Sequence, residues 1–93
     1  MSSVNLNNQE TQKIQLQGIA QWELRQIIEQ LGAEKDKEGI LKAKQWQAHV
    51  SDETKVTLGS LTLQSTTVTF VGPTEVLEPL LLEFRKKTLR GGG

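Results

Sequence analysis

The sequence predicts an α+β domain of two layers, in which an antiparallel sheet of three to four strands carries two helices on one face. Three observations lead to this prediction. Apolar residues recur at helical spacing in two segments, they alternate with polar residues in the segments between, and threonine fills many of the alternating polar positions. The predicted order is strand, helix, strand, strand, strand, helix. A length of 93 residues suits one such domain.

The first elements are a short strand and a clear helix. Residues 1–12 are rich in Ser, Asn and Gln without a period, which predicts a disordered N-terminal arm. Ile14 and Leu16 alternate with polar residues and predict a strand that ends at Gly18. A helix is predicted over 20–31, with Gly32 just past its end, because the apolar residues share one face: Ala20, Leu24, Ile27, Ile28 and Leu31.

The middle of the chain predicts strands. Trp46, Ala48 and Val50 favour a strand over 40–50 with a bulge near Lys44-Gln45, and a helix across 42–47 is the alternative. Residues 55–63 predict one bent strand with an inserted residue at Gly59. We expect a turn at 64–66 and a further strand that stops at 72–73. The polar face of the predicted sheet is expected to be rich in threonine, either as a solvated face or as a recognition surface: Thr57, Thr62, Thr67 and Thr69.

The last predicted element is a helix whose apolar face carries Leu77, Leu80, Leu81 and Phe84. Thr74 is the expected N-cap, or the regular helix begins nearer Glu78 so that Pro79 falls in its first turn. The domain is therefore expected to span 13–90, with a flexible Gly tail at 91–93.

Composition excludes several kinds of site. The absence of cysteine excludes a disulfide framework, a thiolate metal site and a thiol nucleophile. His49 is the single imidazole, and the glycines stand singly rather than in a phosphate-binding loop. We therefore predict a protein that is not an enzyme and holds no cofactor or metal ion.

The charges and the lack of a long apolar run bear on partners and location. A net charge of zero argues against a domain built mainly for nucleic acid. The carboxylates of residues 34–38 and 52–53 fit solvated turns, since lysines interleave the first group. No apolar run is long enough to span a membrane or resembles a secretory signal, so a cytoplasmic protein is expected.

Two groups of residues are candidate contact sites. Trp22 falls off the core face of the first helix, where it either packs under a neighbouring loop or contacts a partner. Leu82 and Leu89 fall off the core face of the second helix, which makes a partner surface or homodimer contact of all three residues plausible. The basic helix end is a candidate anion patch, although cations there also suit the helix dipole: Arg85, Lys86, Lys87 and Arg90.

The ending Leu89-Arg90-Gly91-Gly92-Gly93 resembles the Leu-Arg-Gly-Gly ending of ubiquitin and the Gly-Gly tails of sulfur-carrier proteins. That resemblance implies that Gly93 would be adenylated and conjugated. Such carriers end a β-grasp domain with a strand before the tail, whereas this sequence predicts a helix there. Three stretches, 27–35, 46–48 and 58–63, are also similar to small uncharacterised cyanobacterial proteins, which implies no known activity.

The sequence therefore favours a small non-enzymatic protein-interaction or accessory module, with a protein partner or a second copy of itself. Weak binding of nucleic acid or another anion by the basic helix end is the alternative. A ubiquitin-like or sulfur-carrier tail is a more distant alternative.

Overall fold

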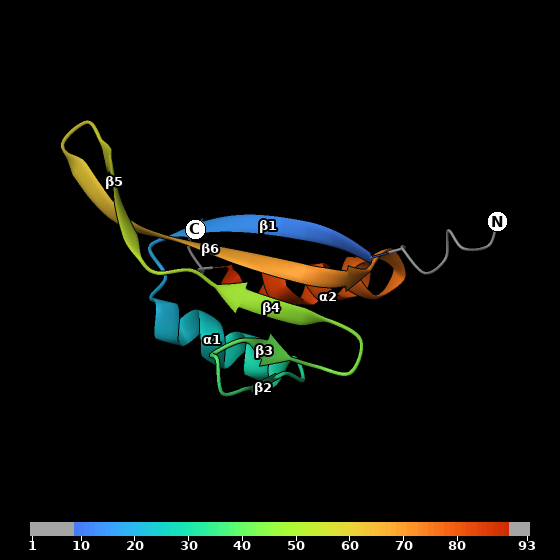
Figure 1. Cartoon of the computed structure of the whole chain (residues 1–93). Coiled ribbons are helices and arrows are strands. Elements are labelled where there is room, and N and C mark those ends of the chain that lie inside the picture. The colour runs from blue at the N-terminus through green and yellow to red at the C-terminus, as the bar shows by residue number, and fades with distance from the viewer. Residues whose placement is uncertain (1–8, 90–93) are drawn as a thin grey trace.

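The computed structural model describes residues 9–89, which form a six-stranded sheet and two helices (Figure 1). In chain order the elements are β1 (Gln9–Gln17), α1 (Gln21–Gln30), β2 (Glu34–Lys35), β3 (Leu41–Lys42), β4 (Gln47–Val50), β5 (Thr54–Leu58), β6 (Leu61–Pro73) and α2 (Thr74–Thr88). The α+β class, the antiparallel sheet and the two helices are confirmed. The predicted count of three to four strands is too low.

The sheet is built around β6. Its strand order is β1-β6-β4-β3-β2, and β5 pairs with the first part of β6. All pairings are antiparallel. β1 runs along residues 65–73 of β6, and β4 pairs with residues 68–71 on the other edge. The longest pairing therefore joins the first and last strands of the chain.

One face of this sheet is covered by both helices. Phe70 of β6 pairs with Ala48 of β4, and Val68 lies two residues before Phe70 on the same strand. The three side chains therefore share a face. They are buried in one cluster with Leu24 of α1 and Phe84 of α2. The Phe70 and Phe84 rings meet edge to face, with centroids 5.0 Å apart. The predicted two-layer packing of both helices on one face is confirmed.

The two helices match the predicted apolar faces. In α1, Leu24 and Ile28 are buried, and in α2 the buried residues are Leu77, Leu80 and Phe84. α2 begins at Thr74 with Pro73 as its N-cap, so the predicted N-cap at Thr74 is wrong by one residue. Pro79 lies inside the helix, which removes the N–H that the Glu75 carbonyl would otherwise accept.

The strand prediction for 40–50 is confirmed over the helical alternative, but the single bulged strand is wrong. The segment folds as β3 and β4 with a tight turn between them, in which the Ala43 N–H donates to the Trp46 carbonyl over 2.8 Å. The turn reverses the chain and places Leu41 opposite Ala48. This reversal explains why Leu41 is buried although it lies on the opposite parity to Ala48.

Residues 55–63 form two strands rather than the predicted single bent strand. Leu58 pairs with Leu61, so Gly59 and Ser60 are the two-residue loop of a hairpin. Gly59 has a φ of +63°, which a type II′ turn places at its first loop position.

Two segments predicted as irregular belong to the sheet. Residues 9–12, placed in the disordered arm, pair with residues 70–73 of β6, so the predicted boundary after residue 12 is wrong. The predicted turn at 64–66 is part of β6, where Ser65 and Thr66 are buried. Gln15 Nε2 donates to Ser65 Oγ over 2.7 Å, which satisfies a buried hydroxyl in the strand. Pairing with a distant strand has outweighed the local turn composition.

The predicted threonine face is divided between two faces of the sheet. Thr57 and Thr62 are cross-strand partners in the β5–β6 hairpin, whereas Thr67 and Thr69 lie in the body of the sheet. β6 is continuous from Leu61 to Pro73, so Thr62 and Thr67 point to opposite faces. The four threonines therefore form no single recognition surface.

Candidate functional site

The β5–β6 hairpin is the part of the described chain that projects beyond the two-layer body (Figure 1). We call residues Thr54–Gln64 the projecting hairpin. β1 ends opposite Ser65, and β4 pairs only with residues 68–71, so the hairpin extends past both neighbouring strands. Its two strands are thus held by each other.

One face of the projecting hairpin carries two aliphatic pairs, with Thr54 beside them at the base of the same face. Val56 pairs with Leu63, and Leu58 pairs with Leu61, which places four aliphatic side chains side by side. We call these four residues the aliphatic face. Leu58 is 54% exposed and Leu61 is 57% exposed, while Val56 and Leu63 are half-buried. The opposite face holds the pairs Lys55–Gln64 and Thr57–Thr62.

The base of the projecting hairpin is fastened to the body by polar contacts. A Glu53 carboxylate oxygen accepts from the Gln21 backbone N–H over 2.6 Å, at the start of α1. Gln21 Nε2 donates to the Ser51 carbonyl over 2.7 Å, and Ser51 Oγ accepts from the Thr67 N–H over 2.9 Å. These bonds connect residues 51–53, which precede β5, to α1 in the helical layer and to β6 in the sheet. The hairpin therefore leaves the body in a defined direction.

The predicted partner residues on the helical layer are all exposed. Trp22 in the first turn of α1 is 66% exposed, Leu82 in α2 is 58% exposed, and Leu89 just after α2 is 74% exposed. Their positions off the core faces agree with the sequence. Trp22 lies on α1, whereas Leu82 and Leu89 belong to α2 and its C-cap, and their joint use as a partner surface stays a prediction.

The basic residues of the predicted anion patch lie in the last turn of α2. Arg85, Lys86 and Lys87 are exposed, and Lys86 Nζ lies 3.4 Å from a Glu83 carboxylate oxygen. Arg90 and the predicted Gly tail at 91–93 lie outside the described residues. Anion binding there stays a prediction.

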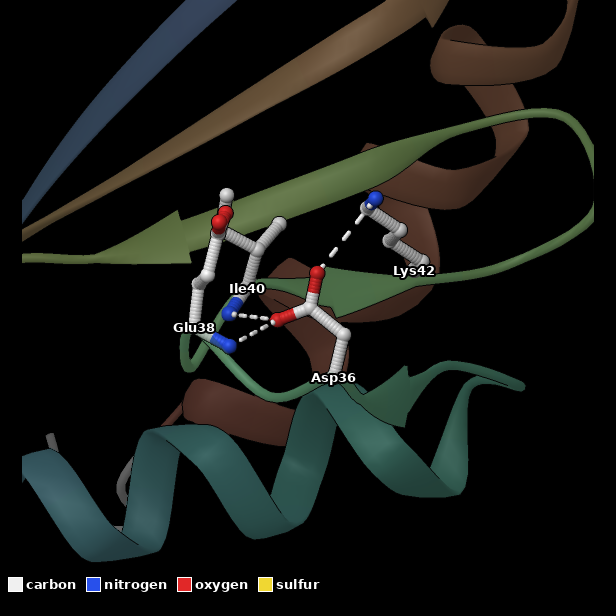
Figure 2. Close-up of polar contacts among 4 residues, drawn as sticks. All are labelled: Asp36, Glu38, Ile40 and Lys42. Carbon is white, nitrogen blue, oxygen red and sulfur yellow. Dashed lines mark hydrogen bonds and ion pairs between the residues drawn. The ribbon is translucent and has the colours of Figure 1, made fainter.

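The carboxylate-rich segment at 34–38 forms a hairpin loop organised by Asp36 (Figure 2). One carboxylate oxygen of Asp36 accepts from the backbone N–H groups of Glu38 and Ile40 over 2.8 and 2.9 Å, and the other lies 3.3 Å from Lys42 Nζ. The hydrogen bond from Ile40 is the main cause that holds the Asp36 pKa below its ordinary value, with smaller effects from Glu38 and Lys42 and an opposing effect of desolvation. The Asp36 carboxylate therefore stabilises the conformation of this loop.

The histidine and the acidic residues do not gather into a metal centre in the part of the chain that the structure describes. His49 is exposed on β4, opposite Thr69 of β6. Across residues 9–89, no group of three or more His, Asp or Glu side chains is placed to hold a metal ion. No helix of those residues is long and apolar enough to cross a membrane.

A cavity of about 420 Å³ lies at the end of the sheet away from the hairpin. The β3–β4 turn forms one wall with Lys44 and Trp46, and β1 and β6 contribute Gln9 and Pro73. The cavity is open, and its polar lining consists of exposed lysine and glutamine side chains.

Sequence reasoning missed the projecting hairpin as a site, although a signal for it was present. Two alternating segments flank the pair Gly59-Ser60, and Gly-Ser is a two-residue loop typical of a type II′ hairpin. Interpreting Gly59 as a bulge instead assigned all four aliphatic residues to a buried sheet face.

Comparison with known proteins gives a family. Residues 12–93 match the family model described as "Archaeal MoaD-like protein", which covers most of the chain. No curated protein matches the chain. The similarity to small cyanobacterial proteins is a separate matter and stays a prediction. Because the family model spans the described domain and the following residues, the chain belongs to the archaeal MoaD-like family.

Proposed function

We propose that this chain is a non-enzymatic, cytoplasmic protein-interaction module and that the projecting hairpin is its contact element. The observation that carries the proposal is the aliphatic face, on which Leu58 and Leu61 are more than half exposed. An isolated two-stranded hairpin is marginally stable in water, and a hydrophobic face needs something to pack against. A protein that covers this face supplies the missing layer.

The anchoring of the hairpin supports the same proposal. Glu53 and Ser51 fix its base to α1 and β6, so the contact face is presented in a constant position. A face that is already oriented loses less conformational freedom on binding than a mobile loop does. This arrangement favours a docking element over a chance protrusion.

A photoreactive amino acid incorporated in place of Leu61, in the natural host, tests the proposal. The matched control carries the same group in place of Thr62, the next residue on the opposite face of the same strand. We expect covalent adducts with a protein from position 61 and far fewer from position 62. Equal adduct formation at both positions, or none at position 61, contradicts the proposal.

A sulfur-carrier tail is the second candidate function, and the family match favours it more than the sequence alone did. The match extends through Gly93 and the family is named after MoaD, while the residues before the tail read Leu89-Arg90-Gly91-Gly92. The position of α2 weighs against it, since a helix of 15 residues separates the last strand from Leu89.

Mass spectrometry of the chain isolated from its natural host separates the two functions. A carrier is expected to show, on a fraction of molecules, the mass of one oxygen exchanged for sulfur at the carboxylate of Gly93. A Gly93 deletion would then abolish that species and leave the position-61 adducts intact. Complete absence of the sulfur species under conditions of sulfur demand contradicts the carrier function.

A further inference from the structure

We propose that the aliphatic face of the projecting hairpin is covered by the same face of a second copy of this chain, so that two hairpins pack face to face about a two-fold axis. This inference rests on the proposed function of the hairpin as a contact element and names its partner. It concerns Val56, Leu58, Leu61 and Leu63.

The distribution of charge favours a second copy. Within residues 54–64 the charged side chain is Lys55, which pairs with Gln64 on the face opposite the aliphatic residues. Two aliphatic faces therefore meet without bringing like charges together. The net charge of the whole chain is zero, so no long-range repulsion opposes the approach of two copies.

The chemistry of the aliphatic face also favours the same face of a second copy as its partner. A specific unlike partner is normally selected by charged or polar groups placed opposite their complements. The aliphatic face offers two rungs of Val and Leu, whose best complement is another array of aliphatic side chains. An interface that uses the same patch on both subunits is the commonest kind in symmetric dimers.

Face-to-face packing fits better than pairing along the free edge of β5. Edge pairing would join the two hairpins by backbone hydrogen bonds but leave all eight aliphatic side chains on one uncovered face. Packing face to face buries them between two layers, as in a small sandwich. The contact is confined to two hairpins, so we expect a weak dimer with a dissociation constant on the order of tens to hundreds of micromolar.

Sedimentation velocity of the full chain over a wide concentration range is the first measurement. The structure supplies a close control, since Leu61 is 57% exposed and Leu82 is 58% exposed. We expect Leu61→Ser to raise the dissociation constant by about tenfold or more, and Leu82→Ser to leave it within about twofold. A chain that stays monomeric up to millimolar concentration overturns the inference, as does a dimer lost on Leu82→Ser and retained on Leu61→Ser.

Single cysteines test the geometry of the contact by an independent measurement. The natural sequence has no cysteine, so each variant carries one thiol. Two Leu61→Cys copies packed face to face can approach disulfide distance, whereas Thr62→Cys thiols point away from the axis. We expect Leu61→Cys to form the linked dimer at least about tenfold faster. Equal rates for the two variants overturn the face-to-face arrangement.

The outcomes separate this inference from the proposed function. A monomeric chain whose position 61 forms adducts with a different protein overturns the second copy and leaves the contact function standing. A monomeric chain without adducts at position 61 overturns both.

Discussion

The two parts of β6 have similar sequences and very different surroundings. Residues 65–73 lie beside β1, are flanked in part by β4 and are covered by two helices, whereas residues 61–64 have β5 as their neighbouring strand. Val68 and Phe70 are fully buried, while Leu61 is 57% exposed. Alternation of apolar and polar residues predicts a strand in both parts. It does not show which face the helices cover: Val68 and Phe70 lie on the covered face of β6, whereas Leu61 and Leu63 lie on the opposite face. That difference separates the folding core from the contact element.

The largest effect is expected from truncation in the covered part. Phe70→Ala removes a fully buried ring that packs against Phe84, so we expect a loss of about 3–5 kcal/mol in the free energy of unfolding. Leu63→Ala, in the half-buried part of the same strand, is expected to cost less than about 1 kcal/mol. Urea denaturation of the two variants checks the comparison, and equal losses would show that the hairpin belongs to the cooperative core.

The next effect compares two glycines, Gly72 in the covered part of β6 and Gly59 in the turn between β5 and β6. A Cβ at Gly72 would lie 3.0 Å from the Gln45 carbonyl oxygen and 3.0 Å from Trp46 Cβ, so the β3–β4 turn must move. We expect Gly72→Ala to cost about 1–3 kcal/mol, measured by thermal unfolding.

The matched change in the hairpin is Gly59→Ala, where a Cβ meets open space and the strain comes from the φ of +63°. It is expected to cost about 1 kcal/mol locally, seen as faster amide exchange in the hairpin rather than as a shift of global unfolding. A global shift as large as that of Gly72→Ala would contradict this division.

Helical periodicity predicted α1 and α2 correctly, because each helix buries one continuous apolar face. Leu24 and Ile28, and likewise Leu77 and Phe84, fall on helical faces that end up buried. The exposure of Trp22 and Leu82 follows from the same helical geometry. Residues 64–66 could not be assigned in this way, because Ser65 is held in the strand by Gln15, which is 50 residues away in sequence.

The contact element was harder to predict than the core. Its hairpin signal at Gly59-Ser60 is local, but its exposure depends on which face of β6 the helices cover. Leu61 and Leu63 lie on the same face as Thr67 and Thr69, opposite Val68 and Phe70. Periodicity within residues 55–63 contains no information about which face the helices cover.

A smaller effect is expected in an exposed loop, the one that Asp36 stabilises. Hydrogen bonds from Ile40, then Glu38, with the charge of Lys42, lower the pKa of Asp36 in the folded state. The stabilisation is therefore complete above the unfolded pKa of about 3.9 and is lost as the pH falls through the lower folded value. Urea denaturation from neutral pH into that acidic range should show a loss that Asp36→Asn lacks. Parallel pH profiles for the wild type and Asp36→Asn would remove this role from Asp36.

The smallest effect on the isolated chain is expected at the aliphatic face, and its dependence on concentration is the informative quantity. In dilute solution Leu61→Ser should change the free energy of unfolding by less than about 0.5 kcal/mol, because the side chain is already 57% exposed in the monomer. As concentration rises, a dimer that forms only from folded chains stabilises the wild type, so the gap between wild type and variant must widen. Leu82→Ser has nearly the same exposure and should show no such widening. A constant gap for Leu61→Ser at all concentrations would mean that Leu61 supports the monomer itself, and the distinction between the two parts of β6 would then be one of degree.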